Sequence, residues 1–389
     1  NWFYGILGSN ERDHTWMDEG LNEYSNIRYW QKKYKGRNEQ IIIQGFVQNK
    51  LGIGKNLSMS WFTYAGYANS GKSKDAQPLN LTAEKYIGGN YWQHYSKTAV
   101  FMRYLEHYLG EDKMDEILQD FYRQWEFRHP YPEDLKAVFA THIQEDLEWF
   151  FDNVFNKTTY VDYGIIKTGD QFILDNYGTF TCPVEVAFYN GSGQEIQRDW
   201  YHKIDNKKKL SLSSGAVSAR IDPDHHMPDV NRSNNSSKKS LNLNFVWDKP
   251  TYFNHDVNIV PWLFSYNYYN GFTPGLTIFS GFAPGYDGRG NVLSFLYDFN
   301  HKKPVGGFSI TRPIRSISLF HASSFNINMN HGSGRTGFNA RITGTIKEPY
   351  VESPVARINA NLFYHYLDST ALDPFLYDGG KFLITSLRY

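Results

Sequence analysis

Acidic and histidine side chains, which bind divalent metals and transfer protons, gather in two short segments of the sequence. The first covers residues 13–23 and contains Glu19, with Glu23 four positions later. On a helix this spacing places the two carboxylates on one face, one turn apart. His14 and Asp18 have the same spacing, but we interpret His14 as a hydrogen-bonded residue at the start of a helix.

The second segment, residues 222–226, contains two Asp and two His. It lies in a turn bracketed by prolines after a predicted strand, and we interpret it as structural. Cys182 is the only cysteine of the chain, which excludes an internal disulfide and a multi-cysteine metal site. Its position in a strand pattern predicts a small residue of the core.

The first segment resembles the gluzincin metallopeptidases of the aminopeptidase N family. In that family a helix carrying an HExxH motif continues as a [Q/N]WF run, to which residues 1–3 (NWF) are similar. Eighteen residues after the second His comes the Glu of an NEG motif, which is the third zinc ligand. Residues 18–20 (DEG) are similar to that motif, and Glu19 is in register with it if a His directly precedes Asn1.

The resemblance implies that one zinc ion is bound by two His and by Glu19, a common ligand set of catalytic zinc. It further implies that Glu23 and Asp13 orient the zinc ligands through hydrogen bonds. Residues 95–99 (YSKTA) resemble the family's Y-[S/E]-K-G-A helix start, whose Tyr hydroxyl hydrogen-bonds the oxyanion of the tetrahedral intermediate. The resemblance therefore implies that Tyr95 is a catalytic residue.

Residues 127–135 and 221–231 extend the resemblance, which covers about residues 1–235 with gaps in 37–90. Two residues differ from the family pattern. Asp18 replaces the usual Asn and adds a carboxylate near the metal, and Thr98 replaces a Gly that allows close approach.

The HExxH motif itself is absent, because no His in the sequence is followed by Glu. We expect the two His ligands, the general-base Glu and the family's Gly-x-Met-Glu-Asn strand to precede Asn1. The chain is therefore interpreted as the C-terminal portion of a larger zinc peptidase that acts on a peptide or protein substrate. Alone it has one zinc ligand of three and is expected to be inactive.

Other readings of these residues stay open. Glu19 could be a solvated acid at a helix terminus, Glu23 a surface acid and Tyr95 an ordinary core tyrosine. At the level of the protein, the alternative function is a non-catalytic, peptidase-like binding platform attached to an outer-membrane β-barrel. A third reading is a barrel whose helical part is a periplasmic assembly module.

Hydrophobic periodicity places these residues in a multidomain α+β protein. Apolar residues recur at three- and four-residue spacing over residues 18–34, 95–109, 114–125 and 132–155, which predicts helices. Gly110 is expected to end the second of these helices in a left-handed cap. The resemblance implies that residues 1–157 form a partial, thermolysin-like helical lobe of a gluzincin domain, and the few periodic signals over 37–90 predict extended loops with short helices there.

After residue 158 the spacing of apolar residues changes to two, which is typical of strands. We expect a small antiparallel β-sandwich over residues 158–228, a polar linker over 229–240 without regular structure, and an all-antiparallel β region over 241–389.

The last region is predicted to be a segment of an outer-membrane-type β-barrel, with a soluble β-sandwich as the alternative. Aromatic residues make up 17% of the chain, and several alternating runs approach the ~9–11 residues of a tilted membrane strand. This interpretation predicts a protein of the bacterial periplasm or outer membrane that associates with the membrane through residues 241–389, although no signal peptide is visible.

The charge balance bears on possible partners. Forty basic and forty acidic residues leave no net charge, so a nucleic-acid-binding surface is not expected. No stretch approaches the ~20 consecutive apolar residues of a membrane-spanning helix.

Overall fold

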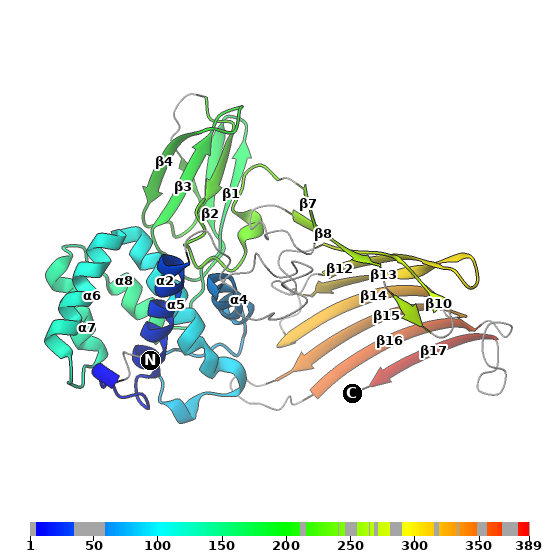
Figure 1. Ribbon diagram of the computed structural model, residues 1–389, viewed down its shortest axis with the longest axis horizontal. Helices are drawn as coiled ribbons and strands as arrows, with labels where there is room; N and C mark the ends of the chain where they lie inside the picture. The colour runs from blue at the N-terminus through cyan, green and yellow to red at the C-terminus, as the bar shows by residue number, and fades with distance from the viewer. Residues whose placement is uncertain are drawn as a thin grey trace. The chain divides into compact units, whose positions relative to one another are not determined.

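Figure 1 shows the computed structural model of the chain, a mixed α+β protein. It divides into two compact units, Asn1–Lys239 and Ser240–Tyr389. The structure describes residues 5–34, 59–210, 215–239, 241–245, 255–263, 265–267, 271–280, 290–314, 319–332, 334–347, 356–367 and 380–388.

The first unit begins with helices, as the periodicity predicted. In the described ranges they are η1 (Trp16–Gly20), α2 (Leu21–Lys33), α4 (Met59–Gly71), η2 (Ala83–Lys85), η3 (Gly88–Trp92), α5 (Gln93–Leu109), α6 (Glu111–Trp125), α7 (Pro132–His142), α8 (Glu148–Phe151) and η4 (Asp152–Asn156). Both η1 and η4 are π-helical turns. The stretch over 37–90 was expected to hold only short helices, yet α4 has 13 residues; residues 37–58 lie outside the described ranges.

Helix α5 forms the centre of this unit, with α2, α4 and α6 packed against it (Figure 1). Its side chains Ala99, Phe101 and Leu105 are fully buried, and the Phe101 ring stacks on Phe180 at 5.6 Å between centroids. Gly110 ends the helix with a φ of 91° and a ψ of 145°. The glycine is needed for its positive φ, but its ψ differs from that of the left-handed helical cap that the sequence predicted.

Two three-stranded antiparallel sheets follow the helices. The first has the order β1-β2-β5 and the second the order β4-β3-β6. Their bounds are β1 (Tyr163–Thr168), β2 (Gln171–Asn176), β3 (Val184–Tyr189), β4 (Glu195–Tyr201), β5 (Lys208–Leu210) and β6 (Ser218–Ile221). The buried rings of Phe172 and Phe188 join the two sheets at 5.6 Å. Cys182 is buried, as predicted.

The segment 231–239 was expected to be polar and without structure, but it folds against these sheets. It contains the short helix η5 (Arg232–Asn234), and Ser236 pairs with Arg220 in an isolated bridge. The Arg232 and Asn235 side chains are buried. Polar composition suggested a linker, whereas hydrogen bonds to buried groups of the sandwich compensate for the burial of these polar side chains.

The second unit contains a nine-stranded sheet in the order β17-β16-β15-β14-β13-β12-β11-β8-β7. Its strands are β7 (Leu241–Phe245), β8 (His255–Trp262), β11 (Gly275–Ser280), β12 (Gly290–Asp298), β13 (Lys303–Pro313), β14 (Ala322–Gly332), β15 (Arg335–Ile346), β16 (Ala356–Leu367) and β17 (Gly380–Arg388). The short strands β9 (Tyr266–Asn267) and β10 (Gly271–Phe272) form a separate pair.

The expectation of an all-antiparallel region is wrong at one place, because β7 pairs with β8 in parallel. Side chains alternate with a period of two in parallel and antiparallel strands alike, so alternation in the sequence does not encode strand direction. The other neighbours within the nine-stranded sheet are antiparallel.

The register of the sheet separates an apolar face from a polar one. We call the apolar row the cross-strand series Ile278, Leu293, Phe308, Met329, Phe338, Tyr364 and Leu383. We call the polar row the series Thr311, Asn326, Arg341, Asn361 and Ser386 on the opposite face. Leu383 in the apolar row is 68% exposed. Among the helices that the structure describes, none is both long and apolar enough to cross a membrane.

Candidate active site

Gly20 brings the first acidic segment into direct contact with α5. A Cβ atom at Gly20 would overlap the side chain of Thr98 and would lie 2.6 Å from the backbone oxygen of His94. Only a glycine therefore lets η1 approach α5 this closely. The Thr98 side chain fills the space beside Gly20.

This approach places Glu19 beside Tyr95. Both residues are partly exposed, and the Glu19 carboxylate lies close enough to the Tyr95 hydroxyl to affect its pKa. Burial is the largest cause that raises the pKa of Tyr95, and the neighbouring Glu19 carboxylate raises it further. The hydroxyl thus stays protonated and remains a hydrogen-bond donor across the physiological pH range.

Further carboxylates surround this pair. Asp18 is buried, and burial, followed by the charges of Glu19 and Glu11, raises its pKa to about 6. Burial and the same three carboxylates also raise the pKa of Tyr91. The site is therefore strongly acidic, which favours a cation or a positively charged group of a ligand.

Glu23 lies on α2, four residues after Glu19 of η1. Its carboxylate accepts hydrogen bonds from two side chains. The Thr63 hydroxyl of α4 donates to one oxygen at 3.1 Å, and the Asn26 amide donates to the other at 3.3 Å. Burial nevertheless raises the pKa of Glu23. Its role in orienting a zinc ligand stays a prediction.

Asp13 and His14 lie in the turn before η1. Asp13 is exposed, and its carboxylate accepts a hydrogen bond from the Asn10 amide at 2.8 Å. The structure therefore places this carboxylate in a local turn, and its role near the metal stays a prediction. His14 Nδ1 lies 3.1 Å from Asn80 Oδ1, which confirms that His14 is hydrogen-bonded at a helix start.

Glu19 is chemically suited to bind zinc, but the described residues do not complete a zinc site. Within the described part of the chain, no group of three His, Cys, Asp or Glu side chains could hold a metal ion. Zinc in a catalytic site takes three protein ligands. The described residues therefore fit one zinc ligand and not the whole set.

Two buried residues on the first turns of α5 were not predicted from the sequence. His94 is fully buried between the rings of Tyr86 and Tyr91, and burial lowers its pKa to about 4. Lys97 is buried as well, burial lowers its pKa to about 7, and its Nζ donates to the backbone oxygen of Lys157 at 3.2 Å. Their three-residue spacing on one helix face was the available signal.

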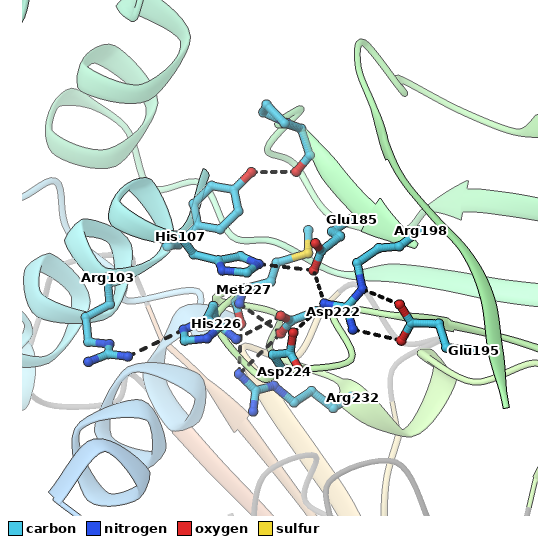
Figure 2. Close-up of polar contacts among 12 residues, drawn as sticks. Arg103, His107, Glu185, Glu195, Arg198, Asp222, Asp224, His226, Met227 and Arg232 are labelled. Carbon is cyan, nitrogen blue, oxygen red and sulfur yellow. Dashed lines mark hydrogen bonds and ion pairs between the residues drawn. The ribbon is translucent and has the colours of Figure 1, made fainter. Parts of the chain in front are cut away.

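The second acidic segment, residues 222–226, is structural as interpreted. The Asp222 carboxylate accepts hydrogen bonds from the backbone N–H groups of His226 and Met227, both at 2.8 Å. Figure 2 shows these contacts within a larger polar network that joins the turn to α5 and β3.

No protein-family model matches the chain, and no curated protein matches it. Among solved structures, the chain is similar to Legionella pneumophila aminopeptidase A in complex with aspartic acid, with 14% sequence identity and a TM-score of 0.39. The match covers 56% of this chain and 24% of that one, so the chain spans about a quarter of the length of this neighbour.

Proposed function

We propose that this chain is part of a zinc-dependent metallopeptidase of the aminopeptidase N type that hydrolyses peptide bonds. Glu19 is one zinc ligand and Tyr95 is a catalytic residue. The observation that carries the proposal is the proximity of these two side chains, since a metal ligand and an oxyanion donor must both lie close to the reacting carbonyl group. The two residues come from separate helical elements that Gly20 brings together.

The proposal assigns a task to each residue of the pair. The Tyr95 hydroxyl donates a hydrogen bond to the oxyanion that forms at the scissile carbonyl, and its raised pKa keeps the proton in place. Glu19 contributes one carboxylate oxygen to the metal site. Zinc, when bound, supplies a Lewis acid that activates water.

The remaining groups of the site belong to residues before Asn1 in this proposal. They are two His ligands and a general-base Glu on an HExxH helix. A peptide with a free amino group suits the acidic surroundings, because Glu11 and Asp18 add negative charge beside Glu19 and Tyr91.

The decisive experiment measures zinc in a protein that contains this chain together with the residues encoded upstream of it. The Glu19→Gln variant should lose bound zinc, because an amide is a poor replacement for a carboxylate ligand. The matched control is Glu11→Gln, an exposed carboxylate of the same site, which should retain zinc. Stoichiometric zinc in Glu19→Gln would contradict the ligand assignment.

The alternative function is a non-catalytic binding platform built on a peptidase-like lobe. Asp18 favours it, because a buried carboxylate stands where the family has a neutral Asn and competes for positive charge. A platform predicts neither zinc retention nor peptide hydrolysis in the extended protein, while a peptide with a free amine still binds.

We further propose that residues 241–389 are an outer-membrane-type β-barrel segment, which places the protein in the periplasm or outer membrane of a bacterium. The support is the apolar row, of which four members are exposed and three partly exposed, since soluble proteins rarely expose large contiguous apolar patches. The opposite face carries the hydrogen-bonded polar row, as expected for a lumen or an aqueous side.

A further inference from the structure

Two histidines from distant parts of the chain stack on each other where α5 contacts the sandwich. His107 lies near the end of α5, and His226 lies in the turn after β6. Their ring centroids are 4.2 Å apart, and the ring planes differ by 17° (Figure 2). Both rings are largely removed from solvent, so their protonation states depend on neighbouring protein groups.

His107 is held by an acceptor on the sandwich. Its Nε2 lies 3.0 Å from the buried Glu185 carboxylate on β3, which can only accept, so Nε2 carries a proton. Arg198 on β4 lies 3.6 Å from the same carboxylate. Burial lowers the pKa of His107, but the hydrogen bond and charge of Glu185 outweigh it and leave that pKa above its usual value.

His226 has the opposite requirement. Its Nδ1 lies 3.4 Å from Nη2 of Arg103 on α5, and a guanidinium can only donate. Nδ1 must therefore present its lone pair, and His226 must be the neutral tautomer with its proton on Nε2. Protonation of His226 would place its Nδ1–H against an N–H group of Arg103. It would also add a positive charge beside the His107 ring.

The turn that carries His226 is rigid on the sandwich side. Asp222 and His225 have φ values of 48° and 63°, which side-chain-bearing residues rarely adopt. The Asp222 carboxylate holds this conformation by accepting the backbone N–H groups of His226 and Met227. Arg232 lies 3.8 Å from Asp222 and donates to the Met227 carbonyl at 2.9 Å.

We propose that the contact between α5 and the sandwich is a pH-sensitive latch, closed while His226 is neutral and released when His226 gains a proton. The ring is anchored in a rigid turn, so it cannot easily turn away from Arg103 and His107 within the closed contact. Separation of α5 from the turn is then the way to solvate the new charge.

The charges that face His226 come from several elements. Arg103 and His107 on α5 and Arg232 on η5 oppose its protonation, and Asp224 in the turn favours it. Burial, the largest cause, and these cations lower the pKa of His226 to about 3. A depressed pKa contributes stability that is present above the ordinary histidine value of about 6.5 and is lost as the pH falls toward 3.

The difference between the ordinary histidine pKa of about 6.5 and the His226 pKa of about 3 predicts how strongly acid opens the latch. Between pH 7.5 and pH 5, His226 alone should increase the population with an open latch about 30-fold. His107 acts in the opposite direction, because its raised pKa favours the closed state in acid. Burial raises the pKa of Asp222 to about 6 as well, but its hydrogen-bond partners lie within the sandwich and move with it.

Cys182 is a built-in reporter of this opening. It is the only thiol of the chain, is 2% exposed, and lies next to Pro183, whose carbonyl accepts a hydrogen bond from Tyr104 on α5. The rate of Cys182 labelling by dithiodipyridine, which reacts with thiols in acid, can be measured on the full chain. It is divided by the rate for the denatured chain at the same pH.

The central comparison is His226→Asn, whose side-chain oxygen can still accept from Arg103 but cannot be protonated. Between pH 7.5 and 5, the corrected labelling rate of the wild-type chain should rise about 30-fold more than that of the variant. His129→Asn is the matched control, because His129 is exposed and should leave the wild-type response unchanged. Equal pH responses in wild type and His226→Asn would overturn the proposal.

A second variant tests the opposing cation without removing His226. Arg103→Gln replaces the guanidinium by a neutral donor, so His226 is easier to protonate in the closed latch. The two chains should differ below pH 5: labelling of the wild type should keep increasing toward pH 3, whereas that of Arg103→Gln should level off at a higher pH, because its His226 is already protonated in the closed latch. An Arg103→Gln response that levels off at the same pH as that of the wild type would also overturn the proposal.

Discussion

At Gly20, the absence of a side chain decides whether the candidate site is assembled. A Cβ at this position would overlap Thr98 and approach the His94 backbone oxygen to 2.6 Å. Gly20→Ala should therefore lower the free energy of unfolding by about 1–3 kcal/mol, the usual cost of overpacking. Urea unfolding of the variant measures this.

Thr98→Gly in the Gly20→Ala background tests the cause. It removes the side-chain overlap but leaves the contact with the His94 backbone, so it should restore only part of the lost stability. If Gly20→Ala were as stable as the wild type, η1 would not pack on α5 as described.

The Tyr95 hydroxyl gives a prediction about rate. In the extended, zinc-containing protein, Tyr95→Phe should lower kcat about 10²–10³-fold and leave KM nearly unchanged, because the hydroxyl acts mainly in the transition state. Steady-state kinetics with a peptide substrate test this. Zinc content should stay that of the wild type, which separates the effect from that of Glu19→Gln. An unchanged kcat would mean that the Tyr95 hydroxyl takes no part in catalysis.

The buried Asp229 carboxylate predicts a loss of stability as the pH rises above the ordinary aspartate value. Burial and then the charge of Asp162 raise the pKa of Asp229, while Asp162 itself is paired with Lys72. A raised folded-state pKa contributes stability that is complete below the ordinary value of about 3.9 and declines as the pH rises toward the raised value. The decline from this group should reach at most about 1.4 kcal/mol per pH unit.

Urea unfolding as a function of pH tests this assignment. Asp229→Asn should flatten the decline, because the variant carries no proton to lose. Asp170→Asn, at an exposed aspartate, should keep the wild-type slope. A wild-type slope in Asp229→Asn would show that another group is responsible.

At the scale of elements, the start of α7 is stabilised by a side-chain cap. Asp134 accepts a hydrogen bond from the Tyr131 backbone N–H at 2.8 Å. Asp134→Ala should lower the free energy of unfolding by about 0.5–2 kcal/mol. Glu133→Ala removes the same charge from the same turn without that bond, so it should cost less in the same urea measurement. Equal costs would mean that the helix dipole, and not the cap, explains the effect.

The sequence predicted the helices and the strands well, but it did not predict how every strand pairs. Three- and four-residue spacing located α5, α6 and α7 well, because one face of each helix is buried in a single core. Alternation located the strands of the large sheet but could not reveal the parallel pairing of β7 with β8. The π-helical turn η1 was not predicted, since its extra residue per turn changes which side chains face α5 without changing composition.

At the scale of the whole molecule, the apolar row of the second unit makes a prediction about lipid. The full chain should bind phospholipid vesicles, and Leu383→Lys should weaken binding about tenfold or more, because a lysine in hydrocarbon is costly. Ser386→Lys is the control on the same strand, since Ser386 belongs to the polar row. Cosedimentation with vesicles measures both. Equal binding by the two variants would favour the soluble sandwich.

The sequence by itself determined which side chains could bind a metal or transfer a proton, and which helices and strands contain them. The first acidic segment, the helix that begins near Tyr95 and the alternating strands follow from residue types and spacing, because burial of one face imposes a period on each element. The resemblance to a zinc peptidase also rests on those residues alone.

Only the tertiary structure decided which distant side chains meet. Tyr95 lies beside Glu19, and His107 stacks on His226, although nothing local in the chain links the members of either pair. Such contacts depend on how whole elements pack, on close approaches such as that of Gly20, and on which polar groups must find partners once buried. For the same reason, the protonation states of Tyr95 and His226 follow from their neighbours in space and not from their neighbours in sequence.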